Sequence, residues 1–354
     1  MINGIMLHHS RLKGRSAGFS LIEIMVAMAI GLLLMAGLLS VVVNTNQSYG
    51  ELNKASLRLE NGRYAMQVLT DDIQHAGFYG EYFNIPSPPA ALPDPCATAP
   101  ANLQAALPLP IQGYEAPATS PLSCLPSANH LTGTDILVIR RVSTATTAVD
   151  ALKEGMVYLQ GRTGDVVLNA AASGSEQNQA IFNLTKKDGT TRADIREFST
   201  AIYFISPCSI PASGSTCSAS ADGGNPIPTL KRIELTHSGT STTMRTTPLV
   251  EGIENLQIEY GIDRSGDGAP NESGLGTGDA YVTNPATTTE WSNGVALRLF
   301  LLARSIQSSA GHQDAKAYDL GQAGTAGPFN DAYKRHLFSA AVRVINPSSR
   351  RETP

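Results

Sequence analysis

An uncharged apolar run near the N-terminus constrains this chain more than any other feature. Residues 24–43 read IMVAMAIGLLLMAGLLSVVV, which is 20 residues without a charged side chain. A helix rises about 1.5 Å per residue, so the run is long enough to cross the roughly 30 Å hydrocarbon core of a bilayer. Three basic side chains lie within residues 11–15, whereas residues 44–50 are uncharged. The positive-inside rule therefore predicts a cytoplasmic N-terminus and export of everything after residue 43.

The small residues of this segment come before the apolar run. An ordinary secretory signal has a shorter apolar stretch, and its small residues for cleavage follow that stretch. Here Ser16, Ala17 and Gly18 precede it. A cut after Gly18 would remove the basic leader and leave the hydrophobic helix on the product.

A lone carboxylate, Glu23, stands at the edge of the apolar run. An unpaired charge there costs about 3 kcal/mol or more, so such residues normally face a partner. Cleavage after Gly18 would create a suitable amine at Phe19, on the same chain or on an adjacent subunit. The alternative is a carboxylate that lies close enough to the headgroups to stay hydrated.

The stretch Gly18-Phe19-Ser20-Leu21-Ile22-Glu23, with a short basic leader before it and an uncharged helix after it, resembles the class III signal of type IV pilins and type II secretion pseudopilins. The resemblance implies that a prepilin peptidase cuts after Gly18 and methylates the new N-terminal Phe19. It also implies that Glu23 engages the N-terminus of a neighbouring subunit during assembly.

The helix is predicted to continue beyond the membrane, to about residue 76. There is no proline between residues 20 and 85, and apolar or small residues recur at steps of three and four, which places them on one stripe: Leu52, Ala55, Leu59, Gly62, Met66, Leu69, Ile73 and Ala76. Between them lie charged residues that we expect on a solvated face: Glu51, Lys54, Arg58, Glu60, Arg63, Asp71 and Asp72. Packing on the chain's own domain is favoured over a coiled coil, which needs a longer heptad run.

Residues 60–65 (ENGRYA), 71–73 (DDI) and 76–80 (AGFYG) narrow the resemblance to the PilW-type minor pilins, which are low-abundance subunits associated with pilus assembly. Two C-terminal elements, VALRL from residue 295 and HLF from residue 336, are similar as well. The resemblance touches both ends of the chain and little of its middle.

The four cysteines lie beyond the apolar segment, and none is in a C-x-x-C spacing, which argues against a zinc site. In an oxidising compartment they predict two disulfides. Nearest-neighbour pairing, Cys96 with Cys124 and Cys208 with Cys217, is favoured among the three connectivities, and free buried thiols are the alternative. Residues 86–126 hold 11 of the 21 prolines, so we expect an ordered excursion without a long helix or central strand; the alternative is a flexible linker.

Downstream, short β-type runs alternate with Gly, Ser, Asn and Pro. They span residues 135–141, 156–160, 165–168, 198–205, 230–236, 256–260, 295–303 and 337–345. The polar stretches 213–224 and 283–293 are predicted to be surface loops. One long helix ahead of many strands predicts an α+β class, a pilin-like fold with the long N-terminal helix packed on a C-terminal antiparallel β-sheet domain.

Asp263, Ser265 and Asp267 precede Gly268 at steps of two, which matches the first half of a calcium-loop pattern apart from the serine. Gly274 stands where the bidentate Glu belongs, so Asn271, Glu272 or Asp279 would have to substitute. The alternative is a polar Asp/Gly turn, and calcium is the only cofactor that the sequence suggests.

Nothing in the sequence favours catalysis or nucleic-acid binding. It contains no G-x-S-x-G, H-E-x-x-H or P-loop motif, and we do not expect an enzyme. The net charge of -4 is no basis for binding nucleic acid.

The predicted organisation has five parts. These are a prepilin leader (1–18), a transmembrane and filament-core half-helix (19–43), an exported amphipathic half-helix (44–80), a Pro-rich ordered region (81–133) and a β-rich exported domain (134–354).

The resemblance implies a minor pilin, a structural subunit of the type IV pilus that takes part in pilus assembly, twitching motility and adhesion. Its implied partners are prepilin peptidase, other minor pilins, the major pilin and the inner-membrane assembly platform. It would lie in the inner membrane as a single span before assembly, and in the pilus at the cell surface afterwards. The alternatives are a minor pseudopilin of a type II secretion system and a membrane-anchored adhesin or calcium-binding module.

Overall fold

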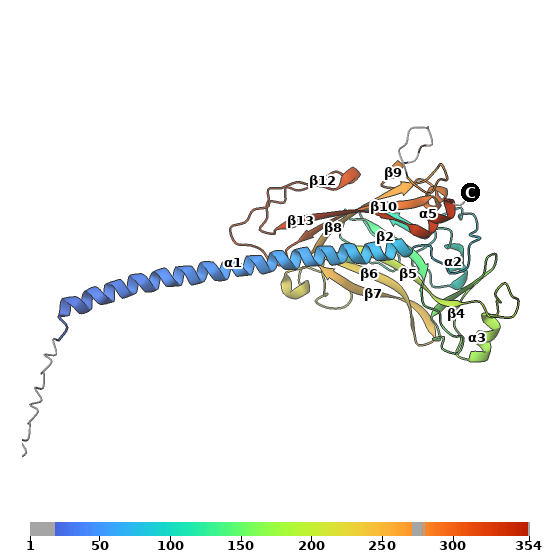
Figure 1. The fold of residues 1–354 in the computed structure, drawn as a ribbon, viewed down its shortest axis with the longest axis horizontal. Helices are drawn as coiled ribbons and strands as arrows, with labels where there is room; N and C mark the ends of the chain where they lie inside the picture. The colour runs from blue at the N-terminus through green and yellow to red at the C-terminus, as the bar shows by residue number, and fades with distance from the viewer. Residues whose placement is uncertain (1–17, 271–277, 279, 353–354) are drawn as a thin grey trace, which may run out of the picture. The chain divides into compact units, whose positions relative to one another are not determined.

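A computed structural model describes residues 18–270, 278 and 280–352 of the chain (Figure 1). Its element order is one long helix followed by a β-rich region with short helices. By contacts the chain divides into two units, residues 1–53 and 54–354. Helix α1 (Leu21–His75, 55 residues) runs through the boundary without a break.

Helix α1 ends two residues before Gly77. Gly77 follows the last helical turn with φ 72°, a left-handed conformation that glycine adopts freely after a helix. Its backbone N–H donates to the carbonyl oxygen of Arg140 at 2.9 Å. The end of α1 is thereby tied to a strand of the β-rich unit.

Two antiparallel sheets make up most of the second unit, and every strand pairing in the described part of the chain is antiparallel. The larger sheet has the order β1-β2-β5-β3-β4, with β6 pairing both β5 and β7. Its strands are β1 (Ile111–Tyr114), β2 (Ile136–Val142), β3 (Val157–Gly161), β4 (Val166–Ala170), β5 (Ile195–Ser206), β6 (Thr229–Ser238) and β7 (Ser241–Glu251).

The smaller sheet has the order β13-β10-β8-β9. Its strands are β8 (Ile253–Ile262), β9 (Ala280–Val282), β10 (Gly294–Arg304) and β13 (Arg335–Arg343), and β11 (Tyr318–Asp319) pairs with β12 (Thr325–Ala326) in the connection between β10 and β13. The short helices are α2 (Pro100–Ala105), α3 (Ser175–Ile181), α4 (Thr288–Ser292) and α5 (Ile345–Arg351), with single 3-10 turns η1 (Ser127–Asn129), η2 (Ala221–Gly224) and η3 (Gly321–Ala323).

The main hydrophobic core lies where α1 meets both sheets. One continuous cluster contains residues of α1 together with buried residues of the larger and the smaller sheet: Ala65, Met66, Leu69 and Ile73 with Tyr203, Ile205, Leu256, Ile258, Leu297 and Leu299. Gly62 belongs to the same contact, because a Cβ added there would overlap the ring of Phe338 on β13. The fold is therefore the expected α+β arrangement of a long helix packed on antiparallel sheet.

The other face of β5 has a separate core. Tyr203 and Ile205 lie in the cluster that includes α1, whereas Ile202 and Phe204 lie in a second cluster with Leu122 and other residues of the Pro-rich region. This follows from the period of two along a strand. The Pro-rich region thus covers the face of the larger sheet that α1 does not.

Each of the eight predicted strands is present, with ends shifted by up to a few residues. Three expectations were wrong in detail. Leu52 is 64% exposed, and the buried stripe of α1 begins only at Gly62. The predicted loop 283–293 contains α4, which buries Trp291. Strand β7 was missed because its sequence, STTMRTTPLVE, is polar and contains a proline, which an edge strand tolerates.

Candidate functional site on the N-terminal helix

The start of α1 forms a reciprocal capping box. The backbone N–H of Ser20 donates to Oε2 of Glu23 at 2.8 Å, and the backbone N–H of Glu23 donates to Oγ of Ser20 at 3.2 Å. A Ser three residues before a Glu satisfies two otherwise unpaired N–H groups at a helix start. A carboxylate is also favoured there by the helix dipole. The Glu23 carboxylate, which was predicted to lack a local partner, thus has one within its own chain. The predicted contact with the Phe19 amine would add to this hydrogen bond.

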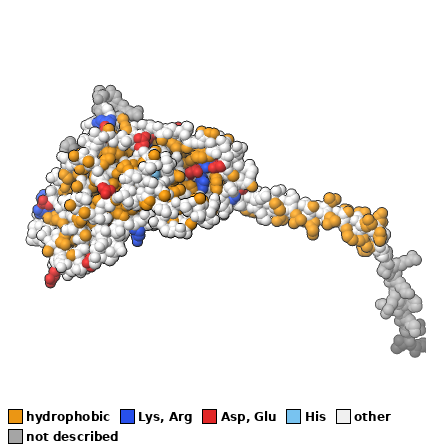
Figure 2. Space-filling model, turned by 180° about the vertical axis from the view of Figure 1, so that it is seen from behind, with side chains coloured by type: hydrophobic (Ala, Val, Ile, Leu, Met, Phe, Trp, Pro, Cys, Tyr) orange, Lys and Arg blue, Asp and Glu red, His pale blue; other side chains and the backbone are white. Residues whose placement is uncertain are grey.

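The first half of α1 exposes all of its apolar side chains. Residues 18–50 are exposed throughout, and an 18-residue window of the helix has a mean hydropathy of 2.7 with none of it buried. Figure 2 shows hydrophobic side chains along the part of the helix in view. Among the described residues α1 is the one helix long and apolar enough to span a membrane. An apolar surface of this extent indicates contact with lipid or with partner helices.

The small residues of this half leave its surface open to close approach. A Cβ added at Gly31 or at Gly37 would meet no atom of the chain within 4 Å. In membranes helices associate through packing, and small residues at the interface let the backbones come close. These two glycines mark where a neighbouring helix has room to approach.

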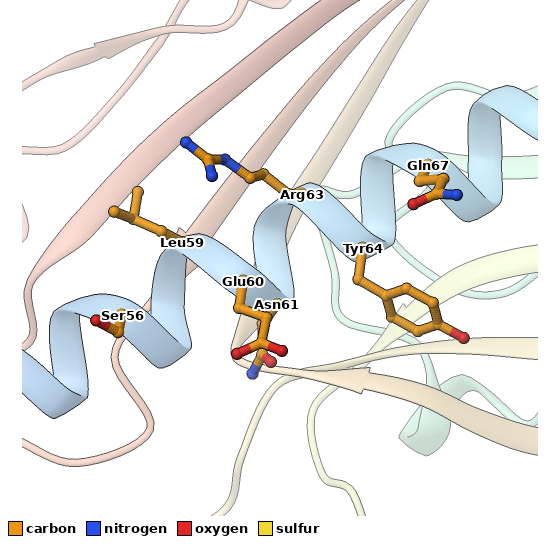
Figure 3. A pocket seen from close by; sticks show the side chains of 7 residues that line it. All are labelled: Ser56, Leu59, Glu60, Asn61, Arg63, Tyr64 and Gln67. Atoms are coloured by element: carbon orange, nitrogen blue, oxygen red, sulfur yellow. The ribbon is translucent and has the colours of Figure 1, made fainter.

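The second half of α1 has a polar outer face. Seven of its side chains line a shallow hollow of about 580 Å³: Ser56, Leu59, Glu60, Asn61, Arg63, Tyr64 and Gln67. In Figure 3 Leu59 and Arg63 extend to one side of the helix, and Glu60, Asn61 and Tyr64 extend to the other. Asn61 is engaged within the unit, since its Nδ2 donates to the carbonyl oxygen of Glu251 at 3.1 Å. The exposed Tyr64 and the flanking charges form a surface suited to polar contacts with another protein.

Asp72 was expected on the solvated face, and that expectation was wrong. Its side chain is buried, and it accepts hydrogen bonds from Nε of Arg141 at 2.6 Å and from the hydroxyl of Tyr203 at 2.6 Å. Burial, with the Asp72 carboxylate beside it, raises the pKa of Tyr203. The spacing carried the signal, because Asp72 lies three residues after Leu69 and so on the apolar stripe. This residue anchors α1 to β2 and β5.

A second buried charge cluster holds the connection between β10 and β13. Arg335 is ion-paired with Glu254 (2.5 Å), Asp314 (3.0 Å) and Asp331 (2.7 Å), and its guanidinium lies over the ring of Phe329. Burial lowers the pKa of Arg335, but hydrogen bonds to the carboxylates raise it by more. Sequence reasoning missed this cluster, because Glu254 and Asp314 lie 81 and 21 residues from Arg335, although Asp331 is only four residues away.

Asp135 links the two sheets. Its carboxylate accepts from the backbone N–H of Ala116 at 2.8 Å and from that of Ile258 at 2.7 Å. Burial raises the pKa of Asp135 to about 7, although the two hydrogen bonds act in the opposite direction. This carboxyl therefore titrates near neutral pH.

The structure gives Asp263 a role in its own loop. The fully buried carboxylate accepts from the backbone N–H groups of Gly266 (2.6 Å) and Gly268 (3.0 Å) and from Oγ of Ser265 (3.1 Å). Nη1 of Arg351 lies 3.3 Å from Oδ2. These contacts form a polar Asp/Gly turn, and a calcium ion would have to displace several of them.

Asp267 is exposed, and its Oδ1 accepts from the backbone N–H of Ala269 at 2.9 Å. The other residues considered as ligands, Asn271, Glu272 and Asp279, lie outside the described residues, as does Gly274. Within the described part no three His, Cys, Asp or Glu side chains gather as a metal site would require. Calcium binding stays a prediction.

The structure pairs Cys96 with Cys124 and Cys208 with Cys217, the connectivity that the sequence favoured. The first disulfide closes the Pro-rich region, which also carries α2 and the edge strand β1. That region is therefore an ordered part of the domain rather than a linker.

Two family models match the chain. A model described as type IV pilus-assembly protein W (PilW) matches residues 216–346, and a model of the prokaryotic N-terminal methylation motif matches residues 13–39. These matches support a type IV pilin-like protein of the PilW family. Searches of curated proteins and of solved structures each returned no match.

The PilW match covers β6 to β13 and includes the C-terminal elements that suggested this family, whereas residues 60–80 lie outside both matches. The methylation-motif match contains Gly18, Phe19 and Glu23, although the roles of these residues in cleavage, methylation and assembly stay predictions. The PilW family serves pilus assembly and is structural rather than catalytic. Together with the apolar helix, the motif indicates membrane anchoring.

Proposed function

We propose that this PilW-family protein is a minor pilin, a structural subunit that takes part in assembling the type IV pilus and so supports twitching motility and adhesion. The observation that carries the proposal is the first half of α1. It is a continuous apolar helix with every side chain exposed, and it begins at a capping box whose acid is Glu23. A soluble domain has no use for such a surface, whereas a subunit that moves from a bilayer into a helical bundle requires it.

In this proposal the precursor enters the inner membrane with its N-terminus in the cytoplasm. Prepilin peptidase cuts after Gly18 and methylates Phe19. Moving from lipid into a bundle of helices gains little hydrophobic free energy, so association depends on packing at small residues and on polar contacts. The Glu23 carboxylate supplies one such contact, to the N-terminus of a neighbouring subunit.

The partners that follow are the major pilin, the other minor pilins and the assembly platform of the inner membrane. The polar outer face around Tyr64 and Arg63 supports contacts with other subunits once the helices are bundled. After assembly the β-rich unit lies at the cell surface as part of the pilus.

Mass spectrometry of the mature N-terminus tests the processing step. We expect a chain that begins at Phe19 with an added methyl group, both in membranes and in sheared pili. A Gly18→Arg variant should keep its leader and be absent from the pili, and Gly14→Arg serves as the control within the leader. Recovery of the chain outside the inner membrane with Met1 still present contradicts the proposal.

Deletion of the gene separates a pilin from a pseudopilin. We expect loss of surface pili and of twitching, with secretion of enzymes by a type II system unchanged. Loss of secretion with normal pili would assign the chain to the secretion machine instead. Normal pili and normal secretion, with the protein held in the membrane, would favour an anchored binding module.

A further inference from the structure

A cavity of about 380 Å³ lies on the face of the larger sheet that α1 does not cover. Its floor is formed by Phe204 on β5 and Lys231 on β6, and Thr246 and Pro248 on β7 extend it. The walls come from two loops, residues 124–129 and 209–215, that reach across the sheet. The lining mixes apolar and polar side chains, and a concave site of this volume is large enough for a small molecule.

Lys231 is the unusual member of this lining. Lys231 is only 6% exposed, yet among the described residues its ammonium has no hydrogen-bond or ion-pair partner. Burial lowers the pKa of Lys231, and the Asp222 carboxylate acts against this from beyond ion-pair distance. The Lys231 ammonium is not one of the fully enclosed polar atoms that lack a partner, so it opens into the cavity. A charged group that is partly desolvated and faces a cavity is a candidate binding group.

The backbone next to Lys231 is irregular. Strands β6 and β7 pair in regular register up to Lys231 opposite Pro248, and there the register shifts, with Leu230 opposite Val250. A β-bulge re-aims side chains and is common beside functional sites. The bulge lies at the position where Lys231 and Pro248 face the cavity.

The walls are fixed before any ligand arrives. Cys124 of one loop is in a disulfide with Cys96, and the disulfide between Cys208 and Cys217 closes the other loop. Asn129 joins the two loops, because its Nδ2 donates to the carbonyl oxygen of Ser215 and its Oδ1 accepts from the backbone N–H of Cys217, both at 2.8 Å. A site with rigid walls binds without a large ordering cost.

Asp222 is used to shape the loop rather than to neutralise the lysine. Its carboxylate accepts from the backbone N–H groups of Ser209 (2.9 Å), Ile210 (2.6 Å) and Ile227 (2.9 Å). The charge of Lys231 is therefore left for a group that enters the cavity.

We propose that this cavity binds a small organic monocarboxylate, with the carboxylate on the ammonium of Lys231. The body of the ligand packs on Phe204 and Leu125 and on the prolines of the rim, and the hydroxyls of Ser209 and Thr246 hydrogen-bond to its polar groups. A single lysine without an arginine or a helix N-terminus balances one negative charge, which favours a carboxylate over a phosphate dianion. This site is independent of the pilus role proposed above.

The test uses the full-length protein in detergent with lysines labelled for NMR, and the Lys231 side-chain signal is assigned by its absence in Lys231→Met. The probes are glucuronate and benzoate, with glucose and benzyl alcohol as neutral matches. We expect at least one acid to shift the Lys231 signal saturably and to raise the pKa of that ammonium, and the neutral matches to leave both unchanged. A Lys231 signal that responds to neither acid, or equally to the neutral matches, overturns the proposal.

Thermal unfolding separates a binding lysine from a structural one. Without ligand, Lys231→Met should melt at the same temperature as the wild type or higher, because the variant removes a partly desolvated charge that makes no ion pair. The acid that binds should raise the melting temperature of the wild type and of the control Lys186→Met, whose lysine pairs with Asp194 at 2.9 Å, and should not raise that of Lys231→Met. A lower melting temperature for ligand-free Lys231→Met, or an equal response in all three proteins, refutes the assignment.

Discussion

Replacing Asp72 by alanine tests how α1 is held on the β-rich unit. The change removes the acceptor of the buried Tyr203 hydroxyl, which lies 2.6 Å from Oδ2. A hydrogen bond to a charged group contributes about 1.5–3 kcal/mol. The Asp72→Ala change also removes the ion pair with Arg141. The Arg141 side chain is 29% exposed, so solvent limits the contribution of that pair to about 1 kcal/mol or less. We expect the free energy of unfolding to fall by about 3 kcal/mol.

Double-mutant cycles in urea, followed by the fluorescence of the single Trp291, divide this loss between the two partners. The cycle of Asp72→Ala with Tyr203→Phe should give a coupling energy of about 2 kcal/mol, and the cycle with Arg141→Met less than about 1 kcal/mol. Asp71→Ala is the matched control. It changes the neighbouring, exposed carboxylate, and its effect should stay within about 0.5 kcal/mol.

Two results would refute the reasoning. One is a loss for Asp72→Ala no larger than that of Asp71→Ala, which would mean that the anchor contributes nothing. The other is a stronger coupling to Arg141 than to Tyr203, which would mean that the partly exposed ion pair dominates over the buried hydrogen bond.

Three further changes have definite expected outcomes. Glu23→Gln keeps an acceptor for the capping box but loses the charge. We expect as few surface pili as in Glu23→Ala, because assembly needs the charge. Normal pili in both variants would refute the role of Glu23. Gly62→Ala should lower stability by about 1–3 kcal/mol, because its Cβ overlaps Phe338, whereas Gly50→Ala in open space should not lower it. The pKa of Asp135 is raised from 3.8 to about 7, so stability relative to Asp135→Asn should fall as the pH rises from about 4 to about 7; a flat difference profile would contradict this.

The large elements were predictable from the sequence because each has a local periodic signal. The apolar run and the three- and four-residue spacing after it define α1, and alternating apolar residues define most strands. Strand β7 has no such signal. It lies at the edge of its sheet, and its mostly half-buried threonines leave only a β-branched bias that resembles a polar loop.

The polar interior could not be predicted in the same way. Asp72, Asp135 and Arg335 are buried because residues more than 60 positions away supply their partners: Arg141 and Tyr203 for the first, Ile258 for the second and Glu254 for the third. The apolar stripe of α1 indicates that Asp72 faces the domain, but no local pattern identifies these distant partners. The capping box is the opposite case, since Ser20 and Glu23 are three residues apart and the sequence alone contains the full signature.

Because of the two disulfides, the shape of the Lys231 cavity depends on the compartment in which the chain has folded. One wall contains Cys124, the disulfide between Cys208 and Cys217 closes the other, and such bonds form and persist in an oxidising compartment. A precursor that is still in the reducing cytoplasm has the same residues but lacks these closures. On the export route proposed above, ligand capture begins only once these bonds have formed, so no cytoplasmic acid fills the site beforehand.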